Sequence, residues 1–253
     1  MINPKIGIVL QARMNSTRLP NKMLLDIEGK TLLEHVVERL KYSKYSQNII
    51  LATSDKEKDA ILVESGKKLG VLTFTGSEDD VLDRYVNAAK KFNLDIIVRV
   101  CGDNIFVDPK GIDQMVNYLI KNKVDYVGSH HEKGWPGGSG AEVITKEALF
   151  KIDKLCKDLK YREHVTLFAR DHKDLFKIYN FDAPLSLSRP NLKLTIDTIE
   201  DLNFVKRVYK KLYNSKKLLE LIDVINLIDK EPSIVSNVHE DTILPHHLNR
   251  FLG

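Results

Sequence analysis

Three cationic and two hydroxyl side chains gather directly after a short apolar run near the start of the chain. They are Arg13, Ser16, Thr17, Arg18 and Lys22, all within ten residues. This set suits a nucleoside triphosphate, whose oxygens accept from hydroxyls and backbone N–H groups, pair with guanidinium forks and contact a lysine as a point charge. The glycine patterns of dinucleotide-binding and Walker loops are absent from this run, which argues against a dehydrogenase and an ATPase. The alternative is a solvated loop that happens to be basic.

Two aspartates occupy positions at which a parallel sheet presents ligands. Asp103 follows a predicted strand and a glycine, and Asp197 ends another predicted strand. Ligands bind beyond the carboxyl ends of such strands, so the two carboxylates are expected to meet at one edge of the sheet. Magnesium takes one or two protein carboxylates and fills its other positions with phosphate oxygens and water, so the pair predicts a magnesium site. The alternatives are a turn role for Asp103 and a helix N-cap for Asp197, a role that Thr198 could equally fill.

The first half of the chain alternates short β-rich runs with helical patterns, and these elements must position the side chains above. Branched apolar runs predict buried strands at 6–10, 49–53, 71–75 and 96–100. Apolar periodicity predicts helices at 32–40, 58–69, 81–92 and 109–121, the last with a proline suited to its first turn. The alternation predicts an α/β fold, a Rossmann-like three-layer sandwich with a mostly parallel twisted sheet and helices on both faces.

The alternation breaks after residues 126–129, where glycines and prolines surround Trp135 in a stretch too irregular for a helix or a central strand. Beyond it the patterns predict strands at 141–145, 176–181 and 192–196, and helices at 147–155, 199–212 and 218–229. We expect one domain at 1–231, with a distinct subregion at about 126–196, and a tail at 232–253 without an assigned element.

The composition is that of an ordinary globular protein, with 253 residues, 43% of them hydrophobic, and a formal net charge of +4. The nearest approach to a basic cluster lies at 206–217, where the spacing indicates the solvated face of an amphipathic helix rather than a nucleic-acid site. Cys101 and Cys156 form no disulfide framework or zinc spacing, and no signal peptide or bilayer-spanning run is seen. We therefore expect a cytoplasmic protein that binds neither nucleic acid nor membrane.

Several motifs in one order resemble a single enzyme family. The run 11–24 closely resembles the nucleotide loop of cytidylyltransferases of the CMP-Kdo synthetase superfamily, especially its spore-coat polysaccharide (SpsF-like) branch. The resemblance continues through GSEDDVLDR at 76–84, RVCGD at 99–103, REHVT at 162–166 and TIDTIED at 195–201. Each motif alone is only suggestive, but the ordered set, which covers about residues 5–212, is specific.

The resemblance implies a nucleotide-diphospho-sugar transferase type of fold, CTP as co-substrate, magnesium as cofactor and a homodimer. It implies that Arg13, Ser16, Arg18 and Lys22 hold the triphosphate. The family pattern assigns the metal to Asp103 and Asp197. It also implies that the backbone at Leu10, Gln11 and Ala12 and the residues around Ser77 and Arg84 face the cytidine. Gly102 and Asp103 are further expected nucleotide-binding positions.

The glycine-rich loop and the run 162–164 are expected to shape a pocket for a small anionic acceptor. The expected contacts are Trp135, Ser139, Glu142, Arg162 and His164. Arg162 would pair with an acceptor carboxylate or phosphate, and Trp135 would cover a sugar ring or another flat apolar face.

His164 would act as a general base, because imidazole titrates near neutral pH. The alternative is a structural histidine at the start of a helix at 165–170. The histidine pair at 130–131 follows a predicted strand and is expected to be solvated, with a place in the pocket lining as the alternative. The pair at 246–247 is expected to form no site, for want of partners at metal-ligand spacing.

One position departs from the family pattern. Members of the SpsF-like branch commonly carry G-x-D-x-E in the glycine-rich loop, whereas the run GSGAE here puts Gly140 in the acidic slot and keeps Glu142. The acceptor, or the second metal if there is one, is therefore expected to differ from the family norm.

The sequence thus predicts a cytidylyltransferase of surface-polysaccharide or glycoconjugate biosynthesis. An acceptor oxygen would attack the α-phosphorus of CTP in line, and Arg13, Arg18 and Lys22 would stabilise the departing pyrophosphate. The alternatives are a nucleotide-sugar glycosyltransferase or another nucleotidyltransferase on the same fold, and a non-catalytic nucleotide-binding homologue.

Overall fold

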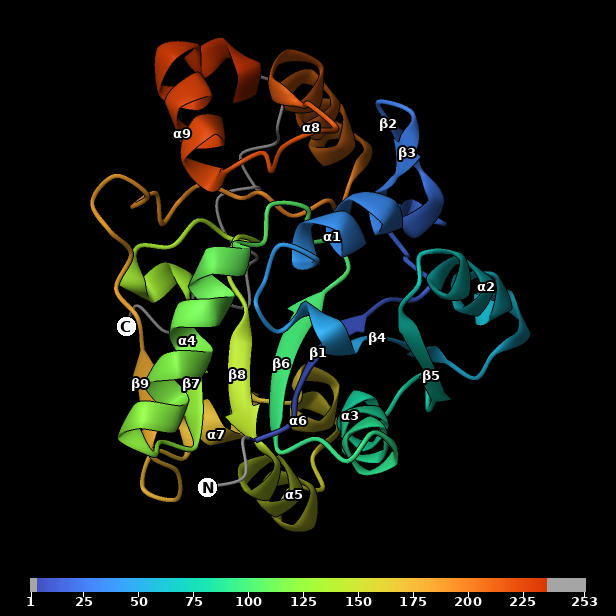
Figure 1. The fold of residues 1–253 in the computed structure, drawn as a ribbon, viewed down its shortest axis with the longest axis vertical. Coiled ribbons are helices and arrows are strands. Elements are labelled where there is room, and N and C mark those ends of the chain that lie inside the picture. Colours follow the sequence, from blue (N-terminus) through green and yellow to red (C-terminus); the bar gives the residue numbers. More distant parts are fainter. Residues whose placement is uncertain (1–3, 236–253) are drawn as a thin grey trace.

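The computed structural model describes residues 4–235 of the chain. Within this range seven strands form one sheet in the order β5-β4-β1-β6-β8-β7-β9 (Figure 1). These strands are β1 (Ile6–Gln11), β4 (Ile49–Ser54), β5 (Leu72–Gly76), β6 (Ile96–Cys101), β7 (Tyr126–Gly128), β8 (Glu142–Thr145) and β9 (Ile178–Asn180). A separate pair, β2 (Asp26–Ile27) and β3 (Lys30–Thr31), follows the loop after β1.

The sheet is mostly parallel. Strand β1 pairs in parallel with β4 and β6, β4 with β5, and β7 with β9, whereas β8 is antiparallel to both β6 and β7. Strands β1 and β4 are buried almost throughout, as expected of near-continuous apolar strands covered on both faces. The predicted sheet is therefore confirmed.

Nine α-helices lie within the described range. They are α1 (Leu32–Leu40), α2 (Ala60–Lys68), α3 (Val81–Lys91), α4 (Pro109–Asn122), α5 (Lys146–Leu155), α6 (Leu159–His164), α7 (Leu167–Asp171), α8 (Ile199–Leu212) and α9 (Leu221–Lys230). Their starts follow local capping chemistry: Thr31 and Thr198 begin α1 and α8 with capping boxes, and Pro109 occupies the first turn of α4 behind its N-cap Asp108.

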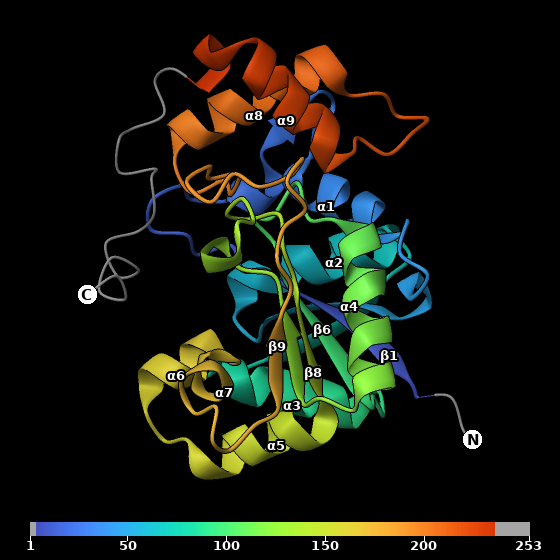
Figure 2. The ribbon, with the colours of Figure 1, turned by 90° about the vertical axis from the view of Figure 1, so that its left-hand side faces the viewer.

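Alternate side chains of the strands supply two hydrophobic cores. Ile8 and Leu10 of β1 belong to a core shared with α1, α4, α8 and α9, whereas Val9 belongs to a second core shared with α3, α5 and α7. Helices therefore cover both faces of the sheet, which confirms the predicted three layers. Helices α8 and α9 lie at one end of the molecule and α5, α6 and α7 at the other (Figure 2).

Three expectations about elements are corrected. Residues 192–196 form no strand in the described structure; they run beside the glycine-rich loop and share one isolated bridge, between Gly137 and Lys193. The helix expected at 165–170 begins two residues later, as α7, and a further short helix, α6, precedes it across a turn at Val165. In the tail, Pro232–Val235 form a 3-10 helix, and residues 236–253, which include His246 and His247, lie outside the described residues.

The basic cluster at 206–217 lies on α8 as far as Lys211, whereas Lys216 and Lys217 follow the end of this helix. The apolar side of α8 is buried through Leu202, Val205 and Val208, while Lys211 pairs with Glu231 at 2.7 Å. None of the helices in residues 4–235 has the length and apolar character needed to cross a membrane.

Candidate active site

The basic loop leaves β1 at the edge of the sheet where β6 also ends. Gln11 is in register with Cys101 of β6, so the loop at 12–22 and the segment at 102–104 emerge side by side. The loop is held by its backbone: the N–H of Met14 donates to Asp59 Oδ1 at 2.7 Å, and the N–H of Asn21 donates to the carbonyl of Met14 at 3.2 Å. The sequence reasoning missed Asp59, a fully buried residue whose only signal was an acidic side chain near a helix start.

A cavity of about 340 Å³ lies between this loop and the ends of β1 and β6. Ten of the twelve residues predicted for the nucleotide and the metal line it, together with seven that were not predicted for either. The predicted ones are Gln11, Ala12, Arg13, Ser16, Arg18, Lys22, Arg84, Gly102, Asp103 and Asp197; the others are Asn15, Thr17, Met23, Val81, Cys101, Glu163 and His164. We call this space the loop cavity.

Two predicted nucleotide contacts lie outside the lining of the loop cavity. Leu10 is fully buried within β1. Ser77 supports its neighbours: its hydroxyl accepts from the Asp80 N–H at 3.0 Å, and its carbonyl accepts from Arg84 Nη1 at 2.7 Å.

Lys22 joins the two predicted metal ligands at the floor of the loop cavity. Its Nζ donates to Asp103 Oδ2 at 2.8 Å, to Asp197 Oδ1 at 3.2 Å and to the carbonyl of Ile196 at 2.8 Å. The two aspartates meet although residues 192–196 form no strand, because the Ile196 N–H donates to the carbonyl of Asp103 at 3.2 Å. The structure therefore brings together the two carboxylates that the sequence placed at separate strand ends.

The charges at this point are strongly coupled. Burial by itself would raise the pKa of Asp197, but Lys22, Lys193 and Arg18 outweigh it and lower that pKa to about 2. Burial by itself would lower the pKa of Lys22, but Asp103 and Asp197 outweigh it and raise that pKa. At neutral pH the site is thus a set of fixed charges, cations around carboxylates, of the kind that receives a polyphosphate and its ion.

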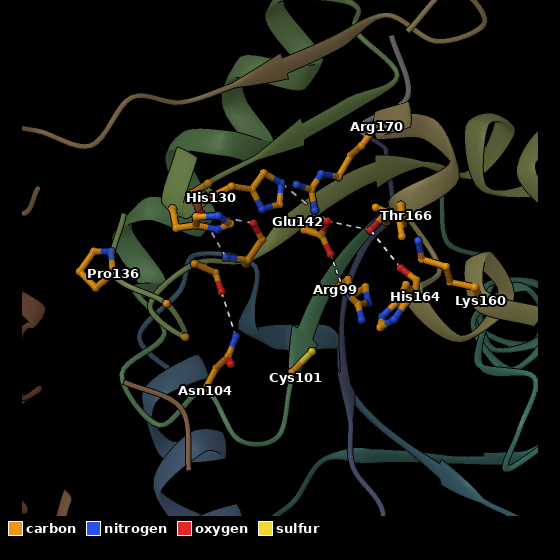
Figure 3. Close-up of a pocket in the computed structure, with 17 residues that line it drawn as sticks. Arg99, Cys101, Asn104, His130, Pro136, Glu142, Lys160, His164, Thr166 and Arg170 are labelled. Carbon is orange, nitrogen blue, oxygen red and sulfur yellow. Dashed lines mark hydrogen bonds and ion pairs between the residues drawn. The ribbon is translucent and has the colours of Figure 1, made fainter. Parts of the chain in front are cut away.

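A second cavity, of about 280 Å³, adjoins the first. Its lining comes from the glycine-rich loop, the start of β8 and the α6–α7 segment; named by residue it comprises Arg99, Cys101, Asn104, Ser129, His130, His131, Pro136, Gly137, Gly138, Gly140, Ala141, Glu142, Lys160, His164, Thr166, Leu167 and Arg170 (Figure 3). Cys101 and His164 also line the loop cavity, so the two spaces share a wall. We call the second space the loop–helix cavity.

Glu142 lies at the centre of the loop–helix cavity with its oxygens already engaged. It pairs with Arg99 Nη1, and its Oε1 accepts from the Tyr126 hydroxyl at 2.6 Å and from the Thr166 hydroxyl at 2.7 Å. Burial by itself would raise its pKa, but Arg99 leads the opposing charges and the pKa falls to about 2. Glu142 is therefore a buried anion that ties three elements together.

Three residues expected to contact the acceptor line neither cavity. Trp135 is buried in the core, and its indole N–H donates to the carbonyl of Phe181 at 2.9 Å. Ser139 is fully buried and its hydroxyl donates to the carbonyl of Pro136 at 2.8 Å. Arg162 is held by Asp80 at 2.6 Å and Asp153 at 2.8 Å. Their polar groups face the protein, so the expected acceptor contacts are corrected to supports of the surrounding loops.

The histidines also differ from expectation. His164 ends α6 instead of starting a helix, and it lines both cavities. His130 and His131 are not a solvated pair but line the loop–helix cavity; His130 Nε2 lies 2.6 Å from the Tyr126 hydroxyl. Burial lowers the pKa of His130 to about 4, against the opposing charge of Glu142, so this ring is neutral near pH 7.

Gly140, which stands where the family pattern has an acidic residue, lies where there is no room for a side chain. A Cβ at this position would lie 2.4 Å from both the carbonyl oxygen and the hydroxyl oxygen of Ser129. Ser129 is fixed there, since its hydroxyl accepts from the Ala141 N–H at 3.3 Å. The packing of this loop therefore uses the glycine, and an acidic side chain needs a different arrangement of the loop.

Comparisons with known proteins agree with this arrangement. A family model described as cytidylyltransferase matches residues 6–222. An uncharacterised protein of Methanocaldococcus jannaschii is 41% identical over 232 residues, covering 91% of this chain and 93% of that protein. The spore coat polysaccharide biosynthesis protein SpsF of Bacillus subtilis is 35% identical, covering 93% of this chain and 99% of that protein.

Solved structures give the same result. A cytidylyltransferase from Leptospira borgpetersenii has a TM-score of 0.88 and 36% identity, with 94% of this chain and 99% of that chain covered. A CMP-2-keto-3-deoxy-manno-octonic acid synthetase complexed with CTP has a TM-score of 0.63 at 19% identity, with 82% and 99% covered, and shares the fold. The chain therefore belongs to the cytidylyltransferase family and is a CTP-dependent nucleotidyltransferase.

Proposed function

We propose that the protein transfers CMP from CTP to a small anionic acceptor, with release of pyrophosphate. The observation that carries this proposal is the pair of adjoining cavities: the loop cavity holds the cationic side chains, and the loop–helix cavity meets it at Cys101 and His164. CTP would occupy the first and the acceptor the second, so that an acceptor oxygen faces the α-phosphorus across the shared wall. Alignment of this kind supplies much of the rate acceleration of phosphoryl-type transfer.

The loop cavity suits the nucleotide in two ways. Arg13, Arg18 and Lys22 supply the positive charge that a triphosphate needs. Gln11 Oε1 and Arg84 Nε are buried without a hydrogen-bond partner in the described structure, and both residues line the cavity. Such orphaned groups need partners, which the polar edge of a base would provide.

The loop–helix cavity suits an anion. Arg99, Lys160 and Arg170 line it against a single carboxylate, Glu142, whose charge Arg99 offsets. Relatives named for spore coat polysaccharide biosynthesis and as 3-deoxy-manno-octulosonate cytidylyltransferases favour a sugar acid and a role in surface-polysaccharide or glycoconjugate biosynthesis. The second kind of relative aligns with only about half of the chain, 47% for the one from Chloroherpeton thalassium.

The donor set fits magnesium. No group of three or more His, Cys, Asp or Glu that could hold a metal occurs among residues 4–235, but Asp103 and Asp197 each place an oxygen within reach of one Lys22 nitrogen. Two hard carboxylates suffice for magnesium when phosphate oxygens and water complete its shell. When bound, the ion would act as a Lewis acid on the triphosphate. Lys22 would then turn from the carboxylates towards the phosphates, and Arg18 would hold the departing pyrophosphate.

The test is a pyrophosphate-release screen of the four nucleoside triphosphates with magnesium, each against sugar acids, sugar phosphates and small phosphorylated metabolites. We expect release to need CTP and one acceptor class together. A higher kcat/KM with another triphosphate contradicts the assignment of CTP, and binding of CTP without release under any condition favours the non-catalytic alternative. The expected homodimer and cytoplasmic location stay predictions.

A further inference from the structure

The wall shared by the two cavities contains an unusual backbone turn. Val165 follows His164 with φ 52° and ψ −67°, and the Thr166 N–H donates to the carbonyl of His164 at 2.6 Å. These values describe a three-residue γ-turn with positive φ, which is rare and strained. For a β-branched residue such a φ is a genuine outlier, so the surrounding structure must hold it in place.

Two contacts hold the turn. The side chain of Val165 is fully buried in the core between the sheet and helices α3, α5 and α7. The hydroxyl of Thr166, a residue that is 1% exposed, donates to Glu142 Oε1 at 2.7 Å. Val165 is thus held by the core and Thr166 by β8. Because these two residues directly follow His164, the backbone that carries His164 has little freedom.

The acceptor of that bond is itself fixed. Glu142 is paired with Arg99 of β6 (Figure 3). It also accepts from the Tyr126 hydroxyl of β7, so its position is set by the central sheet. The chain of contacts thus runs from the sheet through Glu142 and Thr166 to the turn, and ends at the histidine that lines both cavities.

We propose that Glu142 and Thr166 are positioning residues that hold the Val165 turn and thereby fix His164 between the nucleotide and the acceptor. The assignment of the two cavities to nucleotide and acceptor rests on the proposed function. The hold that Glu142 and Thr166 have on the position of His164 does not. Strain is tolerated here because relaxation of the turn would move the imidazole off the shared wall. A displacement of about 1 Å at such a point can cost about 100-fold in rate.

The first experiment observes His164 directly, without any acceptor. The protein is labelled with ¹³C at histidine Cε1, and the His164 signal is assigned from its loss in His164→Gln. We expect Thr166→Val, which keeps the shape and removes the hydroxyl, to shift or broaden this signal, whereas Thr166→Ser keeps it in place. The signal of His35 on α1 serves as an internal reference, because this ring is held by a hydrogen bond with the carbonyl of Ile27 at 2.7 Å and takes no part in the turn.

A matched control separates positioning from stability. Thr145→Val removes a part-buried threonine hydroxyl that caps α5 by accepting from the Ala148 N–H at 3.2 Å and takes no part in the turn. Val165→Gly tests the turn by a second change. It removes the buried side chain and lets the backbone move, because glycine adopts many conformations besides this positive φ, and it leaves the Thr166 hydroxyl in place. We expect Val165→Gly to broaden the His164 signal and Thr145→Val to leave it unchanged.

A binding cycle completes the test. Calorimetric CTP affinity, measured with magnesium, should fall about tenfold in His164→Ala and in Thr166→Val, and the double variant should fall no further than His164→Ala alone. An unchanged His164 signal in both Thr166→Val and Val165→Gly, or additive losses in the cycle, overturns the proposal. A wild type that binds no CTP overturns the proposed function instead, while the NMR comparison still decides the coupling.

Discussion

The ammonium nitrogen of Lys22 lies 2.8 Å from Asp103 and 3.2 Å from Asp197, so one lysine bridges the two carboxylates of the proposed metal site. In the proposed metal site, a divalent ion would compete with this lysine for the same two carboxylates. A bound triphosphate would offer Lys22 alternative anions and would leave the carboxylates to the ion. We therefore expect metal binding and nucleotide binding to be linked.

We predict that Lys22→Met binds Mn²⁺ in the absence of CTP about tenfold more tightly than the wild type, because the competing cation is gone. The same variant should bind CTP more weakly. Calorimetry or Mn²⁺ EPR measures both affinities. Lys110→Met, which removes an exposed lysine paired only with Glu220 at 2.8 Å, is the control and should match the wild type. Equal Mn²⁺ affinities in Lys22→Met and the wild type contradict the prediction.

The carboxylates themselves should be needed for turnover rather than for folding. We expect Asp103→Asn and Asp197→Asn each to lower kcat by about 100-fold or more in the pyrophosphate-release assay, since charge neutralisation at the phosphates would be lost. Asp26→Asn, at an exposed residue of β2, is the matched control. Near-native activity of either site variant at saturating magnesium would show that the metal assignment is incorrect.

Gly140 should resist substitution for steric reasons. In Gly140→Ala a Cβ would meet two oxygens of Ser129 at 2.4 Å, and overpacking of this kind lowers the melting temperature by about 4 °C or more. Gly137→Ala is the control in the same loop, because the nearest atoms to its Cβ are 3.7 and 3.8 Å away. Differential scanning calorimetry of the two variants checks this, and similar melting temperatures speak against a packing role for Gly140.

Acid should destabilise the fold through Glu142. Its pKa is about 2 in the folded state, below the ordinary value of 4.5, so its contribution to stability is fully present above about pH 4.5 and is lost as the pH falls towards 2. The contribution is on the order of 3 kcal/mol at neutral pH. Urea unfolding between pH 7 and pH 3 should show the decline.

Glu142→Gln supplies the comparison for the acid titration, because it keeps the shape of the side chain and has no carboxyl proton to bind. We expect its unfolding free energy to be lower at pH 7 and to depend less on pH below 4.5. An identical pH dependence in the variant and the wild type indicates that other groups carry the acid sensitivity.

The sequence by itself determined the layered α/β fold and most of the loop cavity. Strands such as β1 are apolar on both faces, and helix α8 carries its own capping box, so local physics sets these elements with little help from distant contacts. The side chains of Arg13, Arg18 and Lys22 reach the loop cavity because their loop leaves the carboxyl end of a parallel strand, a place that the order of elements already dictates.

Only the tertiary structure decided the neighbourhood of the second cavity. Whether Trp135 or Arg162 faces a pocket or the protein depends on partners such as Phe181 and Asp80, which lie 46 and 82 residues away in the chain. The bridge from Lys22 to Asp103 and the turn at Val165 likewise depend on long-range contacts, since a strained backbone and a buried ion pair persist only where the completed fold holds them. Periodicity and motif spacing carry no information on such contacts, because they record which residues alternate along an element and not which distant residue will satisfy a buried polar group.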